Sequence, residues 1–362
     1  MPDLESELLG IIAAWHERGE ELRDDAFDDL ALRIFAHQLR RNEPYARYCA
    51  ARGVTTDRMP SSWEAIPPVP AAAYKEATLA TFDTKHAALV FESSGTTLGR
   101  GGRHYMEASA LYDAALLAGF DRFVLSVLSL SKDDGARLRY LNLVPNPAER
   151  PHSSLGYMMA RVSRERGAGK TRWYLRGDDL AVDAFFADLQ DAVAAAQPVC
   201  IATTAFALLA VLDAADARGV RFRLPPKSRI METGGFKGRT RVISREELYA
   251  RASSSFGIPE SQIVAEYGMT ELTSQYYDAL PRREKVGPPW LRARAVGTDG
   301  ATLPEGVVGA LVHVDLANLS SCIAVQSEDL GARVGSGILL IGREEGAELR
   351  GCSLDAETLG VR

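Results

Sequence analysis

Residues 198–218 read PVCIATTAFALLAVLDAADAR. The opening PVCIATT is a short apolar run that predicts a buried strand, and the stretch from Ala205 to Arg218 predicts a helix. This is the longest apolar stretch of the chain, but Thr203, Thr204 and Asp213 interrupt it. It therefore falls short of a membrane span, and we interpret it as a strand followed by a helix.

The same order recurs on both sides of this stretch. Further strand-like runs are AALVF (87–91), RLRYLNLVP (137–145), TRWYLRG (171–177), RIMETGG (229–235) and SQIVAEYG (261–268). Helix-like runs cover residues 109–128, 153–167, 178–197 and 244–256. Aspartates open the third of these helices, where the helix dipole favours them, and Ser244 with Glu247 suits a capping box. Strands that alternate with helices indicate an α/β fold with a mostly parallel sheet covered by helices.

The two ends of the chain follow other patterns. Apolar residues at helical spacing predict two amphipathic helices in the first 42 residues. The proline-rich passage Pro60–Pro70 does not suit a continuous helix. After Lys285, runs such as GALVHVDL and GILLIG predict a β-rich subregion that closes the domain. The domain boundaries that we predict are 1–341 for one large domain, 1–70 for its helical N-terminal subregion and 342–362 for a hinge-like tail.

Composition excludes several classes of protein. The 362 residues are 46% apolar and carry 42 basic and 48 acidic side chains, a net charge of −6. This is ordinary for a globular protein and argues against nucleic-acid binding. The amino terminus lacks the basic start and apolar run of a signal peptide. The four cysteines, Cys49, Cys200, Cys322 and Cys352, do not have metal-ligand spacing and favour a reducing cytoplasm.

A loop rich in glycine and hydroxyl residues follows the strand-like run at 87–91. It contains Ser93, Ser94, Gly95, Thr96 and Thr97, followed by Gly99, Gly101 and Gly102. Such a loop presents backbone N–H groups and hydroxyls with little steric bulk, which suits polyphosphate. It is not the Walker pattern, because no GK[ST] follows. The alternative interpretation is an ordinary flexible turn.

A second motif comes directly after the strand-like run at 261–268. It consists of Glu266, Tyr267, Gly268, Met269, Thr270 and Glu271. Polar groups at the carboxyl end of a strand are well placed for a ligand at the edge of an open sheet. The carboxylate of Glu271 could bind Mg²⁺, and the hydroxyl of Thr270 could meet a phosphate oxygen. The alternative is a helix start in which these two residues serve as a cap.

A third group of residues lies near the carboxyl end. Asp329 could accept hydrogen bonds from a ribose diol, and Arg343 could neutralise phosphate or bond ribose oxygens. A solvated turn is the alternative. Cys352 follows Arg350 and Gly351, and a nearby cation stabilises a thiolate while glycine leaves the sulfur accessible. The alternative for Cys352 is a surface cysteine with no role, and the other three cysteines have surroundings typical of packing residues.

Together these segments resemble the acyl-adenylating superfamily, which includes phenylacetate-CoA ligase, and most closely the acyl-protein synthetases of bacterial luminescence (LuxE type). The resemblance covers roughly Ala87 to the carboxyl end. It rests on SSGTT, METGGFKGR, EYGMTE, SEDLG and GREEGAELRGCSL. The last segment is the most diagnostic, because that family carries its acyl-accepting cysteine near the carboxyl end.

The resemblance implies a role for each motif. The implied nucleotide contacts are Ser93–Thr97 on the ATP phosphates, Gly234 and Gly235 against adenine, Glu266–Thr270 along the nucleotide and carboxylate site, and Asp329 and Arg343 on the ribose. Glu271 would bind Mg²⁺, and Cys352 would take the acyl group as a thioester. The implied fold is a large acyl-adenylating-type domain whose C-terminal domain is absent or reduced to a short tail.

Three functions stay open at this stage. The first is ATP-dependent activation of a carboxylic acid, fatty or aryl, with transfer through Cys352 to a carrier protein, CoA or a partner enzyme. The second is an acyltransferase that, without ATP, moves an acyl group from CoA or a carrier through Cys352 to a carrier protein. It stays open because Leu98 replaces the glycine that the superfamily usually has, and only Arg100 and Arg103 supply positive charge. The third is a non-catalytic relic of the fold.

Three histidines lie near these motifs. His104 follows the glycine loop and could meet phosphate or a carboxylate, whereas His152 precedes a segment that the resemblance places along the acyl pocket. For both of these and for His86, a solvated or core histidine is the default interpretation.

Overall fold

The computed structural model describes most of the chain, which divides into two compact units. Unit 1 comprises 1–119, 268–276 and 284–362, and unit 2 comprises 120–267 and 277–283. The described residues are 3–93, 101–125, 138–169, 171–177, 179–234, 243–279 and 284–343. The predicted residues Ser94–Thr97, Gly235 and Cys352 therefore lie outside the described residues.

Unit 2 contains a parallel sheet. Its strand order is β5 (Arg172–Trp173), β4 (Arg139–Leu143), β8 (Val199–Thr204), β9 (Arg229–Thr233) and β10 (Ile263–Tyr267). All four pairs of neighbours run parallel. The register places Thr204 beside Thr233 and Thr233 beside Glu266, so the carboxyl ends of β8, β9 and β10 share one edge. The predicted parallel sheet is confirmed.

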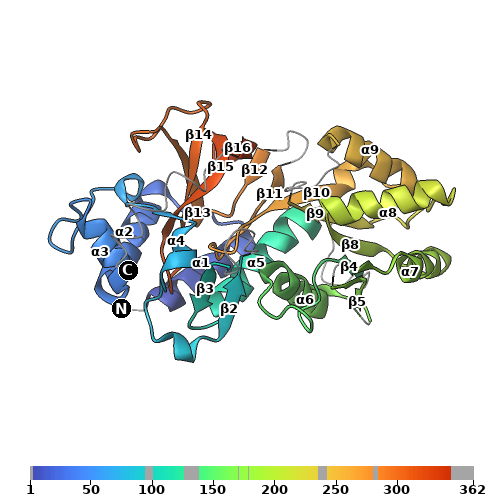
Figure 1. Cartoon of the computed structure of the whole chain (residues 1–362), viewed down its shortest axis with the longest axis horizontal. Helices are drawn as coiled ribbons and strands as arrows, with labels where there is room; N and C mark the ends of the chain where they lie inside the picture. Colours follow the sequence, from blue (N-terminus) through green and yellow to red (C-terminus); the bar gives the residue numbers. More distant parts are fainter. Residues whose placement is uncertain are drawn as a thin grey trace. The chain divides into compact units, whose positions relative to one another are not determined.

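Helices cover the sheet of unit 2, as Figure 1 shows for α7, α8 and α9. Their bounds are α6 (Ser154–Arg166), α7 (Val182–Ala194), α8 (Ala205–Ala217) and α9 (Arg245–Phe256). One face of the sheet, with Leu141, Ile201 and Ile230, packs against the apolar sides of α7, α8 and α9. Burial of this alkyl surface is the main force that holds the layers together. Ser244 caps α9 by accepting from the Glu247 N–H, as the sequence predicts.

Two details of unit 2 differ from the sequence prediction. Residues 171–177 form two short strands, β5 and β6 (Leu175–Arg176), and β6 pairs antiparallel with β7 (Asp179–Leu180). The helix predicted from residue 178 begins at Val182 because Asp179 belongs to β7. A tight β6–β7 hairpin with Gly177 at positive φ reverses the chain before the helix begins.

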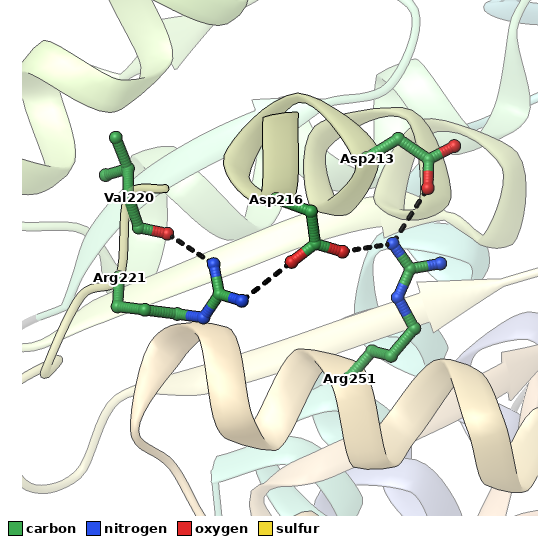
Figure 2. A network of polar contacts seen from close by, with 5 residues as sticks. All are labelled: Asp213, Asp216, Val220, Arg221 and Arg251. Atoms are coloured by element: carbon green, nitrogen blue, oxygen red, sulfur yellow. Dashed lines mark hydrogen bonds and ion pairs between the residues drawn. The ribbon is translucent and has the colours of Figure 1, made fainter. Parts of the chain in front are cut away.

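A network of ion pairs joins the surfaces of α8 and α9 (Figure 2). The Arg251 guanidinium lies 2.8 Å from Asp213 Oδ1 and 2.7 Å from Asp216 Oδ2. Asp216 also accepts from Arg221, which donates to the Val220 carbonyl. These groups are partly exposed, so the network contributes little stability compared with the apolar layer beneath it.

The N-terminal helices of unit 1 match the sequence prediction. The two predicted helices are α1 (Leu4–Arg18) and α2 (Asp24–Arg41), and a third, unpredicted helix, α3 (Glu43–Ala50), follows them. The proline-rich passage forms the short 3₁₀ turn η1 (Trp63–Ala65) and the strand β1 (Val69–Pro70) rather than a helix. The short helix α4 (Ala73–Glu76) and the turn η2 (Thr84–His86) follow.

The β-rich region predicted after Lys285 is an antiparallel sheet in unit 1. Its order is β13 (Leu291–Val296), β14 (Gly309–Asp315), β15 (Ala324–Val334), β16 (Gly337–Arg343) and β12 (Glu284–Val286). All four neighbouring pairs run antiparallel, and β1 pairs parallel with β15.

Unit 1 also contains the hairpin of β2 (Leu89–Glu92) and β3 (Arg103–Met106). The sequence prediction includes β2 but assigns no element to β3. Helix α5 (Ala110–Phe120) enters unit 2 at its last residue and continues as a π-helical turn, η3 (Asp121–Leu125). The remaining elements are η5 (Glu260–Gln262) and β11 (Tyr276–Ala279). Among the described residues, no helix combines the length and the apolar character that crossing a membrane requires.

Candidate functional site

The carboxyl edge of the unit 2 sheet carries polar side chains that the sequence prediction assigns to the nucleotide. Thr233, the last residue of β9, donates its hydroxyl proton to the buried carboxylate of Glu266 in β10. Gly234 then turns the chain with a φ of 76°, and no atom of a described residue lies within 4 Å of where its Cβ would stand. Glycine adopts this backbone conformation without steric cost.

A second polar layer supports this edge from within unit 2. The Tyr249 hydroxyl donates to Glu232 Oε2 at 3.0 Å. Arg245 pairs with the buried carboxylate of Asp278, which also accepts from the Ala265 N–H at 3.1 Å. Burial raises the pKa of Tyr249, so its hydroxyl stays protonated and able to donate. The Asp278 bond fixes the backbone of β10 next to Glu266, and the Tyr249 bond holds the Glu232 side chain next to Thr233.

The hairpin of β2 and β3 fixes the base of the predicted phosphate loop. Ser93 donates its N–H to the Gly102 carbonyl at 2.9 Å, and its hydroxyl accepts from the Gly102 N–H at 2.8 Å. A Cβ on Gly101 would stand 2.1 Å from the Ser93 carbonyl oxygen, so only glycine fits there. Arg103, one of the two candidate phosphate cations, is exposed and pairs with Glu92 at 2.8 Å. The Ser93 hydroxyl thus closes the base of the loop.

The buried His104, in β3, contacts the second motif. Its Nδ1 lies 2.8 Å from the Thr270 carbonyl oxygen. Burial lowers the pKa of His104 to about 4, so the imidazole is neutral at neutral pH. Because a carbonyl oxygen can only accept, Nδ1 carries the proton. His104 is therefore a core histidine, as its default interpretation predicts, and the bond that its Nδ1 makes is to the backbone. His86 and His152 are exposed, which also agrees with their default interpretation.

Two further buried side chains hold the residues after Thr270. Asn318 Nδ2 donates to the Glu271 carbonyl at 2.9 Å and to the Cys322 carbonyl at 2.8 Å. The Asp315 carboxylate accepts the N–H groups of Thr273 at 2.9 Å and of Ser274 at 2.8 Å. The Glu271 side chain itself is buried.

The structure brings the two predicted ribose residues together. Asp329 in β15 and Arg343 in β16 are directly opposite each other in the antiparallel register. The Asp329 N–H donates to the Ser327 hydroxyl at 3.2 Å. Asp329 and Arg343 are therefore neighbours on adjacent strands of the unit 1 sheet.

The three described cysteines are free and buried. Burial raises the pKa of Cys49 and of Cys200 to about 12, and it raises the pKa of Cys322 well above the usual range. A nucleophilic thiol needs a thiolate and access to its substrate. These three residues meet neither condition, which agrees with their interpretation as packing residues.

The predicted residues divide between the units. Unit 1 contains Ser93, Gly268–Thr270, Glu271, Asp329 and Arg343, and unit 2 contains Gly234, Glu266 and Tyr267. Sequence reasoning missed Asp315 and Asn318, although Asp315 directly after the apolar run GALVHV and Asn318 three residues later were an available signal. Within the described ranges, no three His, Cys, Asp or Glu side chains are grouped as a metal site.

The fold is that of acyl-adenylating enzymes. The structure of 2-hydroxyisobutyryl-CoA ligase in complex with 2-HIB-AMP and CoA matches with a TM-score of 0.63 and 13% identity, over 89% of this chain and 70% of that one. The same ligase in its postadenylation state gives 0.62 and 12%, over 89% and 68%. McyG A-PCP with phenylalanyl-adenylate gives 0.51 and 17%, over 73% of this chain and 48% of that one, so this chain spans about half its length. At such identities the likeness shows the fold alone.

The chain belongs to the LuxE acyl-protein synthetase family, because the model of that family matches residues 9–358. The comparison with curated proteins gave no match. The predicted family and fold class are therefore confirmed.

Proposed function

We propose that this protein activates a carboxylic acid with ATP and carries the acyl group as a thioester on Cys352. The observation that carries the proposal is the family match, which extends through the segment with Cys352. The burial and raised pKa values of Cys49, Cys200 and Cys322 support it, since they leave Cys352 as the remaining candidate thiol.

The described residues fit a nucleotide. No described residue fills the space beside Gly234, which supports a planar base there, and the Glu266 carboxylate in the neighbouring strand can accept from an exocyclic amine. Asp329 and Arg343 are of residue types that suit a ribose diol and a phosphate, and the strand register places their backbones opposite each other. Ser93 anchors the loop whose N–H groups would meet the phosphates.

The described residues also fit Mg²⁺. This ion keeps several waters and is usually bound by one or two carboxylates together with substrate phosphates. The structure offers one buried carboxylate, that of Glu271, for this purpose. The described residues contain no group of three His, Cys, Asp or Glu side chains that could together hold a metal ion, which agrees with that preference. When bound there, Mg²⁺ would neutralise phosphate charge. Glu271 would hold the ion and Thr270 would orient a phosphate oxygen.

The proposed chemistry has two steps. A carboxylate oxygen of the acid attacks the α-phosphorus, and the bond to pyrophosphate breaks, which gives an acyl-adenylate. The Cys352 thiolate, after losing its proton to solvent, then attacks the acyl carbon, and the bond to AMP breaks. This splits one difficult substitution into two easier ones, because AMP is a far better leaving group than oxide. The thioester then passes to a thiol of a carrier protein, of CoA or of a partner enzyme.

Intact-mass measurement tests the proposal. The protein is incubated with a panel of fatty and aryl acids, ATP and Mg²⁺, and pyrophosphate release is followed in parallel. We expect release of pyrophosphate and the added mass of one acyl group, which also identifies the acid. Cys352→Ala should abolish the added mass, whereas the matched control Cys200→Ala should keep it. Equal loading of both variants would refute the role of Cys352.

A second candidate function is acyl transfer from a thioester without ATP. The replacement of the usual loop glycine by Leu98 favours it. Acyl-CoAs offered without ATP distinguish the two functions. Loading on Cys352 from acyl-CoA together with no pyrophosphate from any acid would support the transferase. No loading from any donor would support a non-catalytic relic.

A further inference from the structure

The segment Thr270–Ser274 is held through its backbone by side chains from distant parts of unit 1. His104 bonds the first carbonyl, Asn318 bonds the second, and Asp315 accepts from the last two N–H groups. His104 and Asp315 are fully buried and Asn318 is 1% exposed. Since buried polar groups cost free energy when unpaired, these bonds define one backbone conformation for the segment.

Asn318 is fixed from both sides. Its Nδ2 donates to the Glu271 and Cys322 carbonyls, and its Oδ1 lies 3.4 Å from the Thr273 hydroxyl. The Asn318 carbonyl in turn accepts from Gln38 Nε2 at 2.8 Å, which ties it to helix α2. The position of the Glu271 backbone is therefore set by a chain of bonds that begins in the N-terminal helices.

Asn42 provides a natural comparison. It is also fully buried, and its Nδ2 also donates to a backbone carbonyl of the same loop, that of Ser321 at 3.2 Å. It differs from Asn318 in one respect that matters: none of its bonds reaches Thr270–Ser274. The two residues therefore share chemistry and burial but not the contact with the motif.

We propose that Asn318 and His104 are positioning residues that fix Thr270 and Glu271 for binding of Mg²⁺ and ATP. This inference rests on the proposed function. A carboxylate that coordinates a metal must be held within a fraction of an ångström by the residues around it, so loss of either bond loosens the site without removing a ligand.

The test compares Asn318→Ala with the matched control Asn42→Ala. Both truncate a buried amide that bonds the same loop, so their melting temperatures should fall by similar amounts. Calorimetry measures ATP binding with Mg²⁺ and with a chelator instead. We expect Asn318→Ala to weaken Mg²⁺-dependent ATP binding about tenfold or more and to shift the Mg²⁺ midpoint of pyrophosphate release upward, since one second-layer bond to a metal site is worth that much. Asn42→Ala should stay within about twofold of the wild type.

A second pair keeps the proposal testable if Asn318→Ala does not fold. His104→Asn retains a donor near the position of Nδ1, whereas His104→Leu removes it. We expect His104→Leu to weaken Mg²⁺-dependent ATP binding and His104→Asn to restore most of it.

The outcomes separate the two proposals. If Asn318→Ala binds ATP as well as Asn42→Ala does, or if the two His104 variants bind ATP equally well, the positioning role is wrong. ATP use by the protein is still supported in that case, provided that the wild-type protein binds ATP. Absence of ATP binding by the wild-type protein would overturn ATP use itself and the inference that rests on it.

Discussion

The buried polar side chains of the two units bond different parts of the chain. The core of unit 2 is made of apolar side chains such as Leu141, Ile201 and Leu212, packed between one face of a parallel sheet and three helices. The buried Ser228 and Asp278 of unit 2 accept from strand N–H groups, those of Val199 in β8 and Ala265 in β10. Unit 1 buries another set of polar residues, Gln38, Asn42, His104, Asp315 and Asn318. Most of these bond the backbone of loops rather than that of strands.

The difference has a physical basis. Alkyl packing is almost non-directional, so it holds layers together and tolerates small shifts. A buried hydrogen bond is directional and costly to break, so it fixes one loop conformation. Unit 2 therefore shows what builds the fold, and unit 1 shows what holds the Thr270–Ser274 segment in place.

The largest expected effect is that of Asp315→Ala. It leaves the N–H groups of Thr273, Ser274 and Ala317 buried without their acceptor. We expect the free energy of unfolding to fall by about 4 kcal/mol, since each orphaned donor costs roughly 1 kcal/mol or more. Urea denaturation followed by tryptophan fluorescence measures this, because Trp290 bonds the Ser274 hydroxyl. The control Asp315→Asn keeps one acceptor oxygen and should lower the free energy of unfolding less. If Asp315→Ala lowered it by no more than a typical surface substitution does, the expected cost of the orphaned donors would be contradicted.

Ile201→Ala makes the corresponding change in unit 2. It removes buried methyl and methylene groups from β8 and leaves a cavity but no orphaned polar group. We expect a loss of about 3 kcal/mol, and about 1 kcal/mol for the control Ile201→Val. Urea denaturation followed by circular dichroism measures both. If Ile201→Ala lowered the free energy of unfolding more than Asp315→Ala does, the expected order of these two effects would be wrong.

Acid should destabilise unit 1 through its buried histidines. Burial lowers the pKa values of His104 and His313 to about 4, below the usual 6.5. The unfolded chain therefore takes up protons first, and stability present above pH 6.5 is lost as the pH falls toward 4. At pH 5 each of the two imidazoles should lower the free energy of unfolding by about 2 kcal/mol. Burial raises the pKa of Asp315 to about 6, which opposes this loss in part.

Urea denaturation at pH 7 and pH 5 measures the effect. The double variant His104→Asn, His313→Asn should flatten the pH dependence. A wild-type protein more stable at pH 5 than at pH 7 would contradict the burial of neutral imidazoles.

The smallest effect belongs to the surface network. Arg251→Ala removes the ion pairs to Asp213 and Asp216, which are partly exposed (Figure 2). We expect a loss of about 0.5 kcal/mol or less, smaller still at high salt, because water and salt screen such pairs. Urea denaturation at low and high salt checks this. A loss comparable to that of Ile201→Ala would mean that charge, rather than apolar packing, joins α8 to α9.

Most elements of unit 2 could be predicted from the sequence. Runs such as PVCIATT and RIMETGG form strands because short apolar segments fit a sheet covered on both faces. The start of the helix at Val182 could not be predicted, because the two paired strands before it, β6 and β7, have only two residues each and give no recognisable sequence pattern. β3 escaped prediction since its four residues have no strong apolar pattern of their own.

The site could be predicted only at the level of its motifs. Glu271, Asp329 and Arg343 stand out because their residue types suit Mg²⁺, ribose and phosphate. The side chains that bond the backbone of the second motif could not be recognised in the sequence. Asn318 lies 47 residues from Glu271, and His104 lies 166 residues from Thr270. Local pattern contains no information about such pairs.

The sequence by itself determined the alternation of strands and helices, the motifs and the family, since these depend on local spacing and residue type. Only the tertiary structure decided which buried polar side chains meet the backbone of Thr270–Ser274. The reason is that burial and directional hydrogen bonds arise only when distant segments pack together.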